Sequence, residues 1–173
     1  MTNRSKSPAM PKTTGSALAD TGVDRKEGIQ VEKSITINRP AADLYKYWRQ
    51  LENLPRWMHH LKSVTSTGNQ SHWVAKGPLG THVEWDAEIV NDVPNQKIAW
   101  QSLPDSEVRS AGAVLFEPAA NGRQTQVTVT MRYDPPAGKL GKAVSTLLGE
   151  KPEHEIEHDL EQFKKEMESA GMV

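Results

Sequence analysis

The sequence predicts an α+β domain in which a curved antiparallel sheet wraps around a long C-terminal helix. Two observations carry this prediction. From Ser63 to Tyr133 apolar residues alternate with polar ones, which is typical of strands with one buried face. After Gly138 the apolar residues recur at helical spacing, and this segment is long enough to cover the concave face of the sheet.

The composition argues against a partner that is a nucleic acid or a membrane. The 173 residues include 21 basic and 22 acidic side chains, so the chain has no global charge that attracts polyanions. The absence of cysteine excludes disulfides, thiolate catalysis and zinc fingers. No apolar run approaches the roughly 18 residues that span a bilayer, and none follows the basic N-terminal residues as in a signal peptide. We therefore expect a cytoplasmic protein without a membrane span; the sequence sets no oligomeric state.

The first 28 residues differ from the rest of the chain. They are rich in Ser, Thr, Pro, Gly and Lys and bury too little apolar surface to offset the entropy of ordering. We expect 1–28 to be a disordered tail and 29–171 to be the folded domain.

The folded part is predicted to open with a strand at 30–37, followed by two short helices. Pro40 suits the first turn of a helix because its ring fixes φ. Apolar residues then recur at helical spacing: Leu44, Tyr47, Trp48 and Leu51. Pro55 interrupts this pattern, so we expect the second helix at 54–61.

Five or six antiparallel strands are expected next, joined by hairpins. The turns are marked by Gly68-Asn69, Pro94-Asn95 and Asn121-Gly122. The alternation is clearest at 82–89, where Trp85 is on the apolar face. Asp134-Pro135-Pro136 ends the sheet, because proline has no amide hydrogen to donate.

The last segment is predicted to be an amphipathic helix that ends at Gly171. Gly149 and Pro152 interrupt its pattern, so we expect a kink or two successive helices. The apolar stripe of its second part comprises Ile156, Leu160, Phe163 and Met167.

Residues 154–158 satisfy the zinc-protease pattern H-E-x-x-H. At about 100° per residue, His154 and His158 fall about 160° from Ile156, opposite the apolar stripe. We therefore expect both histidines to face solvent and predict no metal site.

The order of elements resembles the START-like, helix-grip superfamily (SRPBCC), which includes polyketide cyclase/dehydrase and coenzyme Q-binding proteins. The local match is to bacterial cyclase/dehydrase-like proteins and spans roughly 30–171. It is carried by the segments at 51–58, 77–80, 83–89, 98–100, 135–141 and 159–164. The resemblance implies the helix-grip fold, a ligand cavity and, for the name-giving members, polyketide cyclisation or quinone binding. It supplies no fixed catalytic motif, so we assign no catalytic residue and no cofactor.

Aromatic and apolar side chains are the expected lining of a cavity between the sheet and the C-terminal helix. Their flat faces can stack on a planar ligand, although each could equally be an ordinary core residue. The predicted ligand-binding residues are Trp48, Trp57, Met58, Trp85, Trp100, Phe116, Met131, Tyr133, Leu160 and Phe163.

A few polar residues are candidates for chemistry at this cavity. His59 and His60 are expected near its mouth, and Arg109 could hold a carboxylate or an enolate if it faces inward. His72 and His82 alternate with buried residues and are expected outside. An acidic row on the same outer face comprises Glu84, Asp86 and Glu88.

Three functions remain open from the sequence. The first is a binding or carrier protein for a small hydrophobic molecule such as a lipid, an isoprenoid quinone or an aromatic polyketide. The second is a cyclase or dehydratase that uses His59, His60 or Arg109. The third is a stress-associated interaction module whose working surfaces are the acidic helix face at 150–168 and the N-terminal tail.

Overall fold

The computed structural model describes residues 29–106, 108–134 and 152–170. The predicted tail at 1–28, the helical pattern before Pro152 and the stop at Gly171 therefore lie outside the described residues. In chain order the elements, where η marks a 3-10 helix, are β1 (Ile29–Ile37), α1 (Ala41–Arg49), η3 (Leu51–Arg56), β2 (Leu61–Thr67), β3 (Gln70–Lys76), η4 (Pro78–Gly80), β4 (His82–Val93), β5 (Lys97–Ser102), β6 (Arg109–Pro118), β7 (Thr125–Asp134) and α3 (Pro152–Ala170). No helix of the described part is long and apolar enough to cross a membrane.

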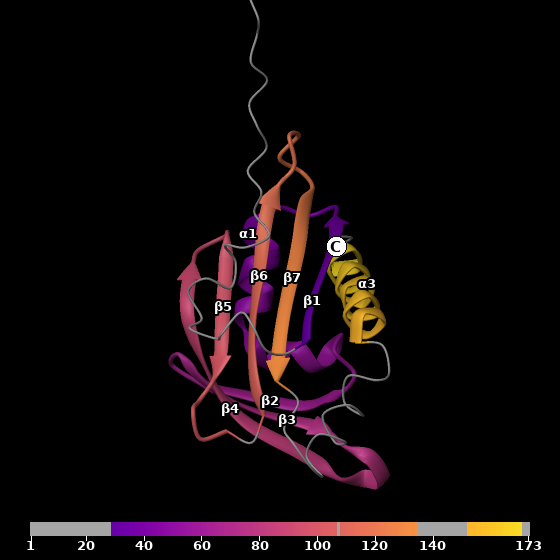
Figure 1. The fold of residues 1–173 in the computed structure, drawn as a ribbon. Coiled ribbons are helices and arrows are strands. Elements are labelled where there is room, and N and C mark those ends of the chain that lie inside the picture. The colour runs from indigo at the N-terminus through magenta and orange to yellow at the C-terminus, as the bar shows by residue number, and fades with distance from the viewer. Residues whose placement is uncertain (1–28, 107, 135–151, 171–173) are drawn as a thin grey trace, which may run out of the picture.

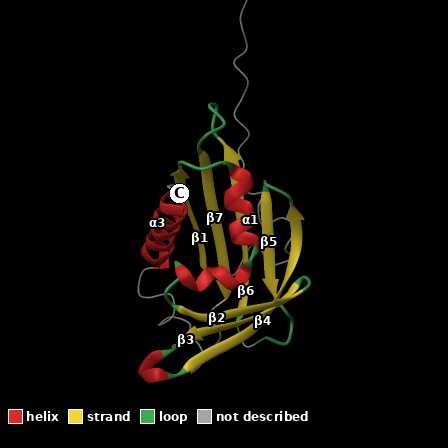
Figure 2. Cartoon of the chain, turned by 180° about the vertical axis from the view of Figure 1, so that it is seen from behind, coloured by secondary structure: helices red, strands yellow, loops and turns green. Residues whose placement is uncertain are grey.

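The strands form one antiparallel sheet in the order β1-β7-β6-β5-β4-β3-β2. The sheet is strongly curved, with β2 and β3 at a steep angle to β6 and β7 (Figure 1). Register shifts between Leu61 and Ser63 and between Ile89 and Asn91 contribute to this curvature, since a bulge bends its strand. Helices α1 and α3 lie on the same face of the sheet (Figure 2). This arrangement confirms the predicted α+β, helix-grip fold.

The alternation in the sequence is explained by this geometry. On β4, Val83 and Ala87 are buried on the inner face, whereas Glu84 and Asp86 are exposed. The expected turns occur where glycine can adopt a positive φ, at Gly68 (63°) and Gly122 (67°).

The second helix is not where the sequence predicted it. It is the 3-10 helix η3 at Leu51–Arg56, and Pro55 lies inside it. A helix at 54–61 is excluded because β3 uses this backbone: Lys76 N donates to His60 O, and Leu61 pairs with Ala75. The prediction for Pro40 was also imprecise, since its ψ of 147° makes it the N-cap of α1 rather than part of the first turn.

Helix α3 begins at Pro152, which suits a residue without an amide hydrogen, and the segment in which a kink or a preceding helix was predicted lies outside the described residues. Three polar contacts attach α3 to β1 and to the residue that follows it. Lys164 Nζ donates to Thr36 O at 3.0 Å, Asn38 N donates to Glu168 Oε1 at 3.1 Å, and Lys33 lies 3.9 Å from Glu157.

An aromatic cluster joins α3 to the rest of the fold. Phe163 on α3 lies edge-on to Trp48 of α1, with ring centroids 5.1 Å apart, and its centroid is 4.7 Å from that of Trp57. Trp48 in turn contacts Phe116 of β6. All four side chains are fully buried, so their contacts combine large apolar burial with specific ring geometry.

Truncation of Phe163 tests how much this aromatic cluster contributes to the free energy of unfolding. Phe163→Ala is expected to lower the free energy of unfolding by about 3–5 kcal/mol, because it leaves a cavity under α3. Phe163→Leu should lower it by less. Urea-induced unfolding followed by circular dichroism measures both, and a loss below about 1 kcal/mol for Phe163→Ala would show that α3 is held by other contacts.

Candidate functional site

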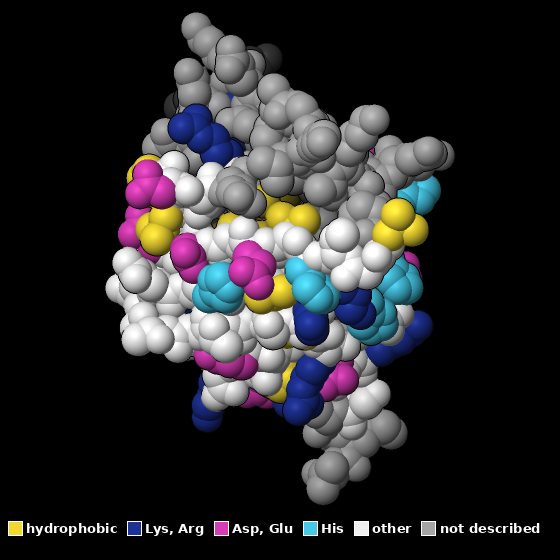
Figure 3. Space-filling model, turned by 90° about the horizontal axis from the view of Figure 1, so that it is seen from below, with side chains coloured by type: hydrophobic (Ala, Val, Ile, Leu, Met, Phe, Trp, Pro, Cys, Tyr) yellow, Lys and Arg dark blue, Asp and Glu magenta, His cyan; other side chains and the backbone are white. Residues whose placement is uncertain are grey.

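A cavity of about 100 Å³ lies between the concave face of the sheet, the α1–η3 segment and the first turns of α3. One buried water needs only about 10–15 Å³, so this space accepts several waters or a small organic ring. Seen from below, hydrophobic side chains are visible between histidine and acidic side chains on this end of the molecule (Figure 3).

The lining is mostly apolar. Of the predicted ligand-binding residues, seven line the cavity: Trp48, Trp57, Met58, Trp85, Trp100, Met131 and Leu160. The structure adds further apolar residues to the wall: Leu51, Leu54, Leu61, Trp73, Val108, Val129 and Ile156.

Two of the predicted residues that the structure describes are not on this wall. Phe116 and Phe163 lie in the aromatic cluster beneath it, where each contacts Trp48. The side chain of Tyr133 lies outside what the structure describes. The alternation of a strand identifies its inner face but not which inner residues border an empty space, and this explains the difference.

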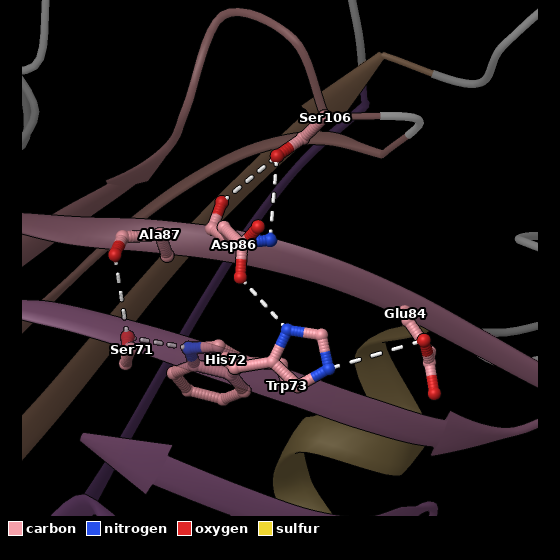
Figure 4. A network of polar contacts seen from close by, with 7 residues as sticks. All are labelled: Ser71, His72, Trp73, Glu84, Asp86, Ala87 and Ser106. Carbon is pink, nitrogen blue, oxygen red and sulfur yellow. Dashed lines mark hydrogen bonds and ion pairs between the residues drawn. The ribbon is translucent and has the colours of Figure 1, made fainter. Parts of the chain in front are cut away.

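Two tryptophans form a flat part of the wall. Trp73 and Trp85 are paired across β3 and β4 and stack with centroids 5.8 Å apart and planes 18° apart. Trp73 Nε1 donates to Ser71 Oγ at 2.8 Å, and Ser71 Oγ donates to the Ala87 carbonyl at 3.5 Å (Figure 4). These hydrogen bonds fix the orientation of the Trp73 ring. The alternation of β3 predicts Trp73 in the sheet interior but not at the site, because its pairing with Trp85 depends on the strand register.

A glycine makes room for the next tryptophan. A Cβ on Gly112 would lie 2.5 Å from Trp100 Cζ2 and 2.8 Å from Met131 Sδ, which are distances that real atoms do not adopt. Only glycine at this position lets Trp100 and Met131 lie against β6 and leave the space above them open.

The outer face of the sheet carries the remaining polar candidates of β3 and β4. His72 faces away from the cavity, with Nδ1 2.8 Å from Asp86 Oδ1 and Nε2 3.9 Å from Glu84 Oε2 (Figure 4). His82 is exposed as well. His72 and His82 are therefore on the outer face of the sheet, as predicted.

Arg109 does not face inward. It is exposed, and its neighbour Ser110 lines the cavity instead. The phase of β6 could not be read from the sequence, because both faces of this strand carry small or apolar residues such as Ala111 and Gly112. His59 is exposed at the rim, with its ring 6.3 Å from that of His158, and His154 is exposed as predicted.

One pair of titratable groups does lie at the cavity wall. His60 Nδ1 is 3.6 Å from Asp159 Oδ2, and the side chains are 24% and 7% exposed. Burial lowers the pKa of His60 to about 4, with smaller effects from the positive charges of His59 and Lys76. Burial also raises the pKa of Asp159 to about 8, helped by the negative charge of Glu155. At neutral pH the pair is therefore an uncharged carboxylic acid beside an uncharged imidazole, and not an ion pair.

Two lining residues carry buried polar atoms without a hydrogen-bond partner among the described residues. They are His60 Nδ1 and Trp57 Nε1. A buried polar atom left unpaired costs about 1–3 kcal/mol, so both atoms favour a ligand that supplies the missing partner.

Asp159 is the member of this titratable pair that was not predicted from the sequence. It directly follows the H-E-x-x-H segment at 154–158, whose histidines were the more obvious candidates. On the helix it is about 60° from Ile156, close to the apolar stripe, and this phase is the signal that could have identified it.

The raised pKa of Asp159 predicts a loss of stability at alkaline pH. Between about pH 6.5 and 8 the folded chain keeps the Asp159 proton and the unfolded chain does not, while His60 is neutral in both states. The free energy of unfolding should therefore fall as pH rises through this window, by up to about 2 kcal/mol. Between about pH 4 and 6.5 the lowered pKa of His60 acts in the opposite sense, so the two contributions oppose each other.

Asp159→Asn should remove the decline between pH 6.5 and 8, and Asp105→Asn, at an exposed aspartate, should keep it. Urea unfolding at a series of pH values measures the slope. The same slope in Asp159→Asn and in the parent protein would contradict the assignment.

Comparisons with known proteins place the chain in a family. Residues 37–161 match the family "Polyketide cyclase / dehydrase and lipid transport". An uncharacterized 17.2 kDa protein from Streptomyces lincolnensis is 31% identical over 146 residues, which cover 82% of this chain and 91% of that protein. The crystal structure of DR_A0006 from Deinococcus radiodurans is 36% identical, covers 82% of this chain and 99% of that one, and has a TM-score of 0.66.

A more distant structure shares the fold. It is the Zhui aromatase/cyclase from Streptomyces sp. R1128, which is 17% identical, with 82% of this chain and 94% of that one covered and a TM-score of 0.63. The match of the family model over most of the domain and the relatives above 30% identity agree with the helix-grip architecture. The chain belongs to the polyketide cyclase/dehydrase and lipid transport family.

Proposed function

We propose that the protein binds a small hydrophobic molecule in the cavity between the sheet and α3. One observation carries the proposal: the chain has five tryptophans, and all five line this cavity. An ordinary core spreads its large aromatic residues among many contacts, whereas here they border one space. Such a wall offers a large apolar surface with flat faces for a ligand.

The shape of the wall favours a planar ring over an extended acyl chain. Trp73 and Trp85 present parallel indole planes, and Gly112 keeps Trp100 flat against the sheet. Among lipids, isoprenoid quinones and aromatic polyketides, the ring-bearing molecules fit these surfaces best. Membership of the family supports ligand binding of this kind.

Binding of p-xylene, a small apolar ring, tests the proposal. Calorimetric titration should show one site per chain. Trp85→Leu should weaken binding about tenfold, or about 1.4 kcal/mol, because the ligand loses an aromatic face. Leu115→Ala, in the separate apolar cluster on the other face of the sheet, should bind as the parent protein does. Absence of binding up to the solubility limit of p-xylene would argue against the proposal.

A second function, cyclisation or dehydration of the bound molecule, is favoured by the pair of Asp159 and His60. An acid whose pKa is near 8 is suited to act as a general acid near neutral pH, and a neutral imidazole beside it is free to accept a proton. His60 would remove a proton next to a carbonyl of the ligand, and Asp159 would protonate the departing hydroxyl, which leaves as water. Transfer of the proton from His60 back to Asp159 across the 3.6 Å gap would restore both groups.

A linear poly-β-ketone distinguishes the two functions. A cyclase converts it to a product that has lost water, and mass spectrometry detects the change. Asp159→Asn and His60→Gln should each abolish the conversion, and His59→Gln, at the exposed neighbour, should retain it. Recovery of the compound unchanged from a protein that binds it would leave binding as the function.

A further inference from the structure

The polar atoms of the cavity restrict the chemistry of its ligand. Among the residues that the structure describes, four polar ones line the cavity: His60, Ser110, Glu155 and Asp159. Glu155 is exposed, whereas Asp159 is 5% exposed and the Nδ1 atom of His60 is fully buried. The polar end of the cavity is therefore the space next to His60 and Asp159.

These two side chains approach each other without a hydrogen bond. The distance of 3.6 Å from Nδ1 to Oδ2 exceeds the usual range, and His60 Nδ1 has no partner among the described residues. A ligand oxygen can lie about 2.8 Å from both atoms at once, because 3.6 Å is less than twice this length. One ligand oxygen that lies beside the pair can therefore hydrogen-bond to both side chains.

The charge states of His60 and Asp159 determine which kind of ligand oxygen can bind between an imidazole and a carboxyl group. Both groups are neutral at neutral pH because burial disfavours their charged forms. A carboxylate on the ligand would be an acceptor only, and it would face Asp159 with Glu155 nearby. An ammonium group would need Asp159 to ionise inside an apolar cavity, which burial opposes.

A hydroxyl group meets both requirements. It donates one hydrogen bond and accepts another, so it satisfies His60 in either tautomer and the protonated Asp159 on the other side. We propose that the ligand is an uncharged molecule with an apolar body and a hydroxyl group, held by hydrogen bonds to His60 Nδ1 and the Asp159 carboxyl. This inference rests on the proposed binding function and names the class of its ligand.

Three compounds that share one ring test the inference: p-cresol, p-xylene and p-toluate. They carry a hydroxyl, a methyl and a carboxylate at the same position. Calorimetric titration of the full chain at pH 7 should show p-cresol binding about five- to tenfold more tightly than p-xylene, and p-toluate binding more weakly than either. This factor corresponds to one or two net hydrogen bonds.

Variants assign the preference to the pair. His60→Leu should remove the preference for p-cresol over p-xylene, and circular dichroism shows whether the variant is folded. His59→Leu is the matched control, since the neighbouring histidine is exposed, and it should keep the full preference. Asp159→Leu should lose the preference, and Asp159→Asn should keep part of it because an amide still hydrogen-bonds.

The outcomes separate the two proposals. Equal binding of p-cresol and p-xylene by the parent protein would overturn the hydroxyl inference and leave the binding function standing. Tightest binding of p-toluate would overturn the argument from charge. Loss of the preference in His59→Leu would overturn the assignment to His60. If none of the three compounds binds, the binding function fails and the inference fails with it.

Discussion

The contact of Phe163 with Trp48 and Trp57 is the interaction on which the site depends. It brings one ring from α3 against a ring of α1 and the ring of Trp57, the residue that follows η3, and both are over 100 residues earlier in the chain. Without it, α3 would keep its polar contacts to β1 and to Asn38. No aromatic contact among the described residues would then hold α3 against α1 over the cavity. The same two tryptophans border the cavity on their other side, so a single layer of indoles both closes the core and lines the space for a ligand.

The cavity combines features that oppose stability. Its apolar walls forgo the packing contacts that a filled core would make, and two buried polar atoms at its edge lack partners among the described residues. Asp159 adds a carboxyl that burial keeps protonated. Each feature disfavours the empty folded protein and each is relieved by a bound molecule of suitable shape and polarity. Such a pattern is typical of a binding site rather than of a defect in packing.

The sequence predicted the architecture well, for a physical reason. A sheet with one buried face imposes a period of two, and a helix that covers it imposes a period near 3.6, so β4 and the stripe at Ile156 and Leu160 are visible in the residues alone. The second helix was misplaced because its end is decided by pairing with β3, which is not a local property. Most of the aromatic lining was predicted, since tryptophans on the inner face of a curved sheet have few other places to lie.

The polar part of the site was harder to predict. His60 was among the candidate histidines, but its partner Asp159 is far away in the sequence, and only the docking of α3 brings them together. Arg109 was a candidate if it faced inward, and it does not. Both faces of β6 carry small or apolar residues, so the sequence does not show which residues of this strand face the cavity. Burial, which sets the charge of both His60 and Asp159, is a property of the assembled cavity and of no segment by itself.

The central claim is that the five tryptophans surround a binding cavity. The most direct measurement is the ¹H–¹⁵N NMR spectrum of the labelled protein, in which the five indole N–H groups are separate reporters, during titration with p-xylene. The indole signals are expected to move with one common dissociation constant, while amides remote from the cavity, such as that of Gly122 in the β6–β7 turn, stay in place. Indole signals that do not move up to the solubility limit, or that move with unrelated constants, would contradict it.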